Sequence, residues 1–149
     1  MLTQKMKQPF KTAQPVLFPP LADRAAWEGL PGAARWAAAG QAALADAQPA
    51  PELPLSLWLQ FTRSGDRAKW EHAYFARRRT LCALAMAEAV TNRGTYLPAL
   101  ADLAWRICEE SAWQLPAHNS YIRDTPQLPL PDVTRPIVDL FAAETGALI

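Results

Sequence analysis

The stretch RAKWEHAYFARRRTLCALAMAEAVTN, residues 67–92, decides the fold class of this 149-residue chain. Its apolar residues recur at roughly helical spacing, at Trp70, Tyr74, Leu81 and Leu84. Asp66 precedes the stretch as a candidate cap, and Asn92-Arg93-Gly94 supplies residues that are favoured at the carboxyl ends of helices. The sequence therefore predicts one long helix over residues 67–92, the longest of the chain.

Shorter helices are expected on both sides of this segment, because proline and glycine punctuate the remaining sequence. The expected helices cover residues 21–30, 31–46 and 95 to about 111 or 113, with a last helix that begins between residues 132 and 136, while residues 55–61 form a short apolar segment. The helix from residue 95 has apolar residues around most of its circumference, so we expect it to be buried. Four prolines predict an irregular stretch over residues 115–131. Successive helices joined by short turns indicate an all-α fold of antiparallel helical hairpins.

The length fits one domain, and we expect an extended arm over residues 1–20 followed by a helical domain over residues 21–149. A net charge of +1 argues against a dedicated nucleic-acid-binding protein. The run Arg77-Arg78-Arg79 is expected to form a solvated face of its helix, and His72 a surface position.

Neither cysteine stands in a metal-binding or redox motif, so Cys82 and Cys108 are expected to behave as small hydrophobic residues. No metal or other cofactor is expected. The first residues lack the pattern of a secretory signal, and no stretch is long enough to span a membrane. As written, the chain is expected to stay in the cytoplasm, without a membrane partner.

The most distinctive sequence is ICEESAWQLPAHN at residues 107–119, followed after a proline-rich loop by DLFAAET at residues 139–145. The glutamate pair, the tryptophan, Leu-Pro-Ala-His-Asn and the last helix together resemble the early toroid of bacterial heparinase II/III-like polysaccharide lyases. The general pattern covers residues 66–149, and the specific motifs begin at Glu109.

In that family an incomplete α/α toroid packs beside a β-sandwich, and the enzymes cleave uronate-containing polysaccharides by β-elimination. The resemblance implies a partial α/α toroid here, truncated at its carboxyl end, with an acidic polysaccharide or oligosaccharide as partner. The β-sandwich is absent from this sequence, and the family's tyrosine and later histidine positions lie beyond it. We therefore expect an N-terminal part of a lyase that has no activity by itself.

The reaction requires a group that neutralises the uronate carboxylate, a base for the C5 proton and an acid for the leaving oxygen. The candidate catalytic residues are His118 and Asn119, and the candidate substrate-binding residues are Trp113, Tyr121, Glu110 and Arg123.

Each candidate also has a structural interpretation. His118 can be a structural histidine that bonds to nearby backbone, Asn119 can form a turn, and Trp113 can complete the core. If Glu110 is buried it needs a partner, for which Arg106 and Arg123 are candidates. The competing function is a non-catalytic helical module that binds a sugar chain or a protein on a concave face with Trp and Arg side chains.

Overall fold

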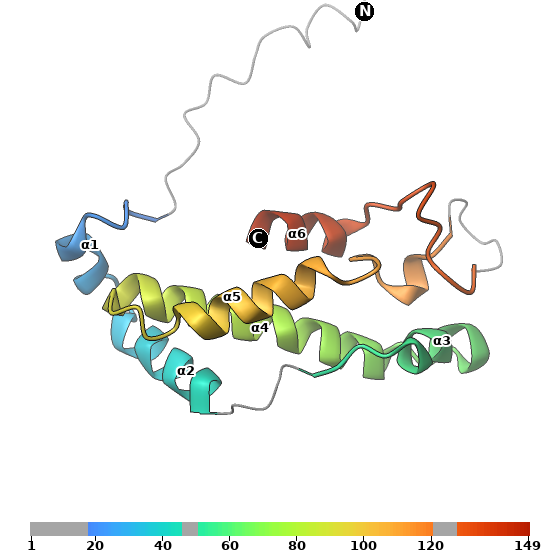
Figure 1. Cartoon of the computed structure of the whole chain (residues 1–149), viewed down its shortest axis with the longest axis horizontal. Helices are drawn as coiled ribbons and strands as arrows, with labels where there is room; N and C mark the ends of the chain where they lie inside the picture. Colours follow the sequence, from blue (N-terminus) through green and yellow to red (C-terminus); the bar gives the residue numbers. More distant parts are fainter. Residues whose placement is uncertain (1–17, 46–50, 121–127) are drawn as a thin grey trace, which may run out of the picture.

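The computed structural model describes residues 18–45, 51–120 and 128–149 (Figure 1). These residues form helices and no strand, which confirms the all-α prediction. The elements are α1 (Arg24–Glu28), α2 (Ala33–Ala45), α3 (Leu55–Ser64), α4 (Ala68–Thr91), α5 (Leu97–Cys108), a single 3-10 turn η2 (Pro116–His118) and α6 (Leu140–Leu148). Apart from residues 18–20, the expected N-terminal arm lies outside the described residues.

Helix α4 is the element against which the other helices pack, and it runs along the long axis of the molecule (Figure 1). It ends at Asn92, which takes the left-handed conformation (φ 50°, ψ 44°) favoured at a helix terminus. The Glu88 carboxylate then accepts hydrogen bonds from the backbone N–H groups of Gly94 and Tyr96, at 2.6 and 3.0 Å. This turn reverses the chain, so that α4 and α5 form an antiparallel helical hairpin.

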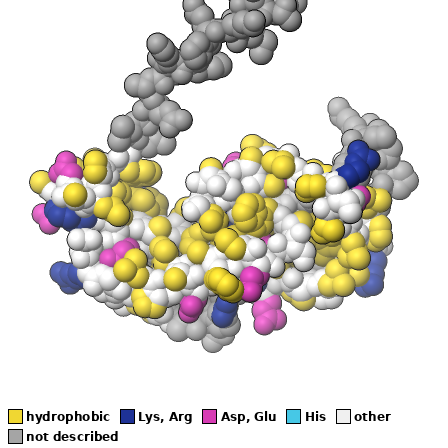
Figure 2. Space-filling model, turned by 45° about the horizontal axis from the view of Figure 1, so that its top comes forward, with side chains coloured by type: hydrophobic (Ala, Val, Ile, Leu, Met, Phe, Trp, Pro, Cys, Tyr) yellow, Lys and Arg dark blue, Asp and Glu magenta, His cyan; other side chains and the backbone are white. Residues whose placement is uncertain are grey.

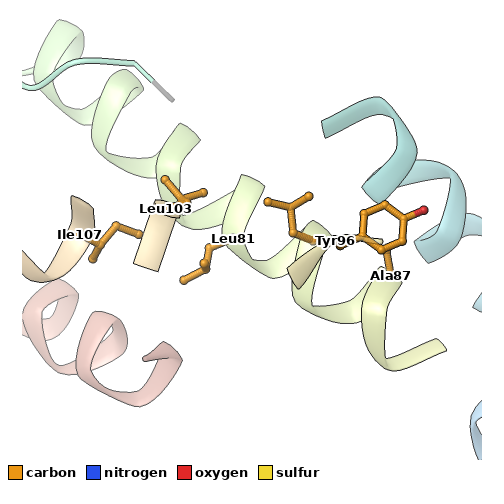
Figure 3. Packing of buried hydrophobic residues seen from close by; sticks show 6 residues of the cluster. Leu81, Ala87, Tyr96, Leu103 and Ile107 are labelled. Atoms are coloured by element: carbon orange, nitrogen blue, oxygen red, sulfur yellow. The ribbon is translucent and has the colours of Figure 1, made fainter. Parts of the chain in front are cut away.

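The main core lies between these two helices (Figure 3). Its buried side chains come from α4, from the turn and from α5: Leu81, Leu84, Ala87, Tyr96, Leu103 and Ile107. A second apolar cluster lies where α3 and η2 meet the first half of α4, and contains Trp58, Trp70, Tyr74 and Leu115. The two clusters share α4, which explains why its apolar pattern extends along its whole length.

Helix α2 approaches α4 so closely that one position admits only glycine. A Cβ atom built on Gly40 would lie 2.1 Å from the Cβ of Ala87 and 3.2 Å from the carbonyl oxygen of Ala83. The carbonyl oxygen of Ala83 is a backbone atom, and the Cβ of Ala87 is attached directly to the backbone. Neither atom can therefore move aside by rotation of a side chain. The small alanine side chains of α2 allow the two helices to approach this closely.

We expect Gly40→Ala to lower the free energy of unfolding by about 1–3 kcal/mol, the usual cost of overpacking a tight interface. The matched control is Gly146→Ala in α6, where the new Cβ would meet Trp113 at an ordinary 3.7 Å. That change should be neutral or stabilise the protein by up to about 1 kcal/mol, because alanine favours the helix. Urea denaturation followed by circular dichroism measures both, and equal effects would contradict the close approach.

Two expected helix boundaries are wrong. Helix α5 ends at Cys108 rather than near residue 111 or 113, and α6 begins at Leu140 rather than between residues 132 and 136. Asp132 explains the second difference, because its Oδ1 accepts hydrogen bonds from the N–H and the hydroxyl of Thr134 and holds a turn there. Asp139 then caps α6 by accepting a 2.7 Å hydrogen bond from Ala142 N.

The expectation that α5 is buried on all sides is also wrong. Only Leu103 and Ile107 are buried within it, while Trp105 is 68% exposed. The reason is that α5 packs against α4 along one stripe and presents its other side to solvent. Figure 2 shows hydrophobic side chains over much of one face of the molecule. The described residues contain no helix with the length and apolar character needed to cross a bilayer.

Candidate functional site

A buried ion-pair cluster joins α4 to the segment that follows α5. Arg78 binds Glu110 with both ends of its guanidinium group, Nη1 to Oε1 at 2.9 Å and Nη2 to Oε2 at 2.6 Å. Arg77 Nη1 adds a 3.0 Å bond to Oε1 of the same carboxylate. All three side chains are at most 10% exposed.

This cluster corrects the prediction of a solvated arginine face, which holds only for Arg79. Arg77 and Arg78 point inward because the end of α5 places a carboxylate opposite them, a tertiary contact that local sequence does not reveal. Among the described residues, the partners of Glu110 are therefore Arg77 and Arg78 on α4 and not Arg106. The other candidate, Arg123, lies outside the described residues.

The cluster continues into α6 through a chain of polar groups. Arg78 Nε donates to Thr145 Oγ1 at 3.2 Å, and its guanidinium carbon lies 3.5 Å from the centre of the Tyr74 ring. The Tyr74 hydroxyl lies 2.8 Å from Thr145 Oγ1 and donates toward the carbonyl oxygens of Trp113 and Phe141, at 2.7 and 3.1 Å. Burial raises the pKa of this hydroxyl, so it stays protonated and remains a donor at neutral pH.

We expect Tyr74→Phe to destabilise the fold by about 1–3 kcal/mol, because it removes the hydroxyl that donates to the part-buried carbonyl oxygens of Trp113 and Phe141. Tyr96→Phe is the matched control, since Tyr96 is also buried but no hydrogen bond to its hydroxyl is found among the described residues. Its effect should be smaller than about 0.5 kcal/mol. Thermal or urea unfolding of the two variants compares them directly, and a Tyr74→Phe variant as stable as the control would argue against the network.

His118 and Asp139 form the arrangement that most resembles a proton-transfer site. His118 Nδ1 lies 2.6 Å from Asp139 Oδ2, and the imidazole stacks on the Phe141 ring with 5.8 Å between centres. The carboxylate is buried and is held in place by the backbone N–H groups of Leu115 and Ala142. The histidine side chain remains 36% exposed, and its other nitrogen, Nε2, has no hydrogen-bond partner among the described residues.

Asn119, the other candidate catalytic residue, is 1% exposed and fully engaged in the loop. Its Nδ2 donates to the carbonyl oxygens of Leu128 and Leu130, at 2.6 and 2.9 Å, and its Oδ1 accepts from Gln114 Nε2 at 2.7 Å. Both amide hydrogens are thus used to tie residues 128–130 to the turn after η2, which leaves none for a ligand in this conformation.

The remaining candidates lie apart from the dyad or outside the described residues. Trp113 is half-buried, packs against the main core and donates from Nε1 to the carbonyl oxygen of Ile107 at 2.8 Å. Tyr121 and Arg123 lie outside the described residues. His72 is exposed on α4, as expected.

Glu110 also borders a groove of about 530 Å³, which we call the Trp58 groove. It runs between α3, the start of α4, the end of α5 and residues 130–133. Its lining residues are Leu53, Leu55, Trp58, Trp70, Arg77, Arg106, Glu109, Glu110, Ser111, Ala112, Leu130, Pro131 and Val133. A second concavity, between α2, α4 and α6, includes Cys82 and Phe141.

The two cysteines differ in accessibility, which gives a direct test of the packing around Cys82 on α4. Cys108 is exposed, whereas Cys82 is half-buried and burial raises the pKa of its thiol. The reactive species is the thiolate, so we expect a thiol reagent at pH 7–8 to modify Cys108 well before Cys82. Mass spectrometry of the labelled protein measures the order, and unfolding in urea should abolish the difference.

The arginine pair and Asp139 are the site residues that sequence reasoning missed. Asp139 opens the DLFAAET motif and carries the signature of a helix cap, but nothing in the sequence indicates its pairing with His118 across 21 positions. Among the described residues no group of three or more His, Cys, Asp or Glu side chains could hold a metal ion. No protein-family model matches this chain, and no curated protein matches it.

Proposed function

We propose that this chain is the N-terminal part of a polysaccharide lyase-like protein that cleaves uronate-containing polysaccharides by β-elimination. The observation that carries the proposal is the pairing of His118 with Asp139. It joins the two sequence motifs on which the resemblance to heparinase II/III-like lyases rests.

In this proposal His118 is the base that removes the C5 proton. Asp139 accepts a hydrogen bond from Nδ1–H and thereby keeps the lone pair on Nε2, the nitrogen that does not bond to Asp139. When Nε2 takes the proton, the C4–O bond breaks, a double bond forms between C4 and C5, and the leaving oxygen takes up a proton from an acid. The buried carboxylate stabilises the imidazolium that results.

The described residues supply one of the three groups that the reaction requires. The amide hydrogens of Asn119 are bonded to backbone carbonyls, so the group that neutralises the uronate carboxylate has to come from another residue. We therefore expect no turnover from these 149 residues alone, and activity only in a longer reading frame that contains them.

The test follows absorbance in the unsaturated-uronate band while acidic polysaccharides are incubated with this chain and with such a longer reading frame. We expect product only from the longer protein, and a loss of about 10²-fold or more in His118→Ala, the usual contribution of a proton-transfer group. Asp139→Asn should lower kcat while leaving KM nearly unchanged, because it acts through the histidine.

His72→Ala is the matched control, since His72 is an exposed histidine on α4 to which the proposed reaction gives no role. It should leave the rate unchanged. Full activity in His118→Ala would contradict the proposed role of the dyad, even if the longer protein proved to be a lyase.

The second candidate is a non-catalytic helical module that binds a sugar chain. The Trp58 groove favours it, because aromatic and arginine side chains line a concavity of a size typical for small ligands. Binding of a polysaccharide without any product, from the chain and the longer protein alike, would support this function instead.

A further inference from the structure

The buried ion-pair cluster carries more positive than negative charge. Arg77 and Arg78 contribute two guanidinium groups, and Glu110 contributes one carboxylate. A charge that is held away from water is costly unless an opposite charge or several hydrogen bonds compensate it. Among the described residues, one positive charge in this cluster therefore has no carboxylate of its own.

Arg77 is the less satisfied of the two arginines. Arg78 uses both ends of its guanidinium group on Glu110, and its Nε on Thr145. Arg77 binds Glu110 through Nη1 and the carbonyl oxygen of Pro51 through Nε, at 3.0 and 2.7 Å. Its Nη2 has no partner among the described residues.

This incompletely paired arginine borders the Trp58 groove, where an anion would meet it. Arg106 lines the same groove from α5 and is exposed. Glu109, also exposed, lies on the same lining and carries the opposite charge to Arg106. The lining thus holds two arginines and two glutamates, but Glu110 is shared with Arg78, which does not line the groove, so the surplus positive charge rests on Arg77.

The rest of the groove is lined mainly by apolar residues, and hydrogen bonds hold one wall of it in place. Trp58 Nε1 donates to the carbonyl oxygen of Pro129 at 3.0 Å, and Asn119 holds the carbonyl oxygens of Leu128 and Leu130. These bonds fix the wall that Leu130, Pro131 and Val133 form opposite α3. Such a wall offers an apolar surface to the face of a ring.

We propose that the Trp58 groove binds a carboxylate-bearing sugar residue, with the carboxylate on Arg77 and Arg106 and the ring against the apolar wall. A guanidinium group suits this role because it can bind a carboxylate through two parallel hydrogen bonds. The volume of about 530 Å³ lies within the range of small-ligand sites.

That the ligand is a sugar rests on the proposed function. That it is an anion rests on the surplus positive charge of Arg77 and Arg78 over Glu110. The groove shares no residue with the His118–Asp139 dyad. Binding can therefore be measured without any reaction, and its failure would leave the test of the dyad unaffected.

The experiment titrates the isotopically labelled chain with D-glucuronate at low ionic strength and follows its amide and indole NMR signals. Signals of the lining residues, including the indole N–H of Trp58, should shift in a saturable manner. D-Glucose lacks the carboxylate and acetate lacks the ring, so both should bind at least about fivefold more weakly. Equal binding of glucose or of acetate would overturn the carboxylate part or the sugar part, respectively.

Four substitutions sharpen the test, and two of them are expected to change the affinity in opposite directions. Arg106→Gln should weaken glucuronate binding about twofold to fivefold, and Glu109→Gln should strengthen it by a similar factor, because each changes one exposed charge beside the ligand. Arg93→Gln removes an equal charge from the exposed α4–α5 turn and should change nothing. Arg77→Gln should abolish binding if it folds. If it does not fold, the Arg106 and Glu109 variants provide the test. Opposite changes in their affinity for glucuronate support the proposal, and an unchanged affinity in both variants overturns it.

Discussion

The contact of Glu110 with Arg77 and Arg78 is the constraint on which the rest of the structure depends. It fixes the end of α5 against α4, and through Thr145 and Tyr74 it fixes α6 against the same helix. Loss of one partner would leave a buried charge unpaired, at a cost of about 3–5 kcal/mol. Such a cost is large beside the total stability of an ordinary domain. The Glu110 carboxylate therefore links α4, the end of α5 and α6 through one set of contacts.

The local part of the fold was predictable from the sequence. The apolar spacing along residues 67–92 and the Asn92 terminus indicated α4 and its hairpin with α5, and both are present. The start of α6 was not predictable, because it depends on the Asp132 turn and the Asp139 cap rather than on periodicity. The exposure of Trp105 was missed for a similar reason: composition shows that a helix is apolar, but not how many neighbours cover it.

The candidate site, too, was predictable from the sequence only in part. His118 stood out by its motif, and the structure gives it a carboxylate partner that no spacing rule would select. Asn119 stood out beside it, yet its side chain holds the loop together. The arginine run was misjudged because its counter-charge, Glu110, lies more than 30 positions away in the sequence. The sequence motifs thus located the loop that contains the candidate site, but only the long-range contacts in the structure show the partner of each residue. The partial α/α toroid remains a prediction.

Helix α6 carries Asp139 at its beginning and Thr145 near its end. The first residue orients the imidazole of His118, and the second receives Arg78 from the charged cluster. Because a short helix moves as a rigid rod, a sliding displacement along its axis would disturb both ends at once. Such a displacement would change the geometry of the histidine and the ion pairs together, because both depend on the position of the same short helix.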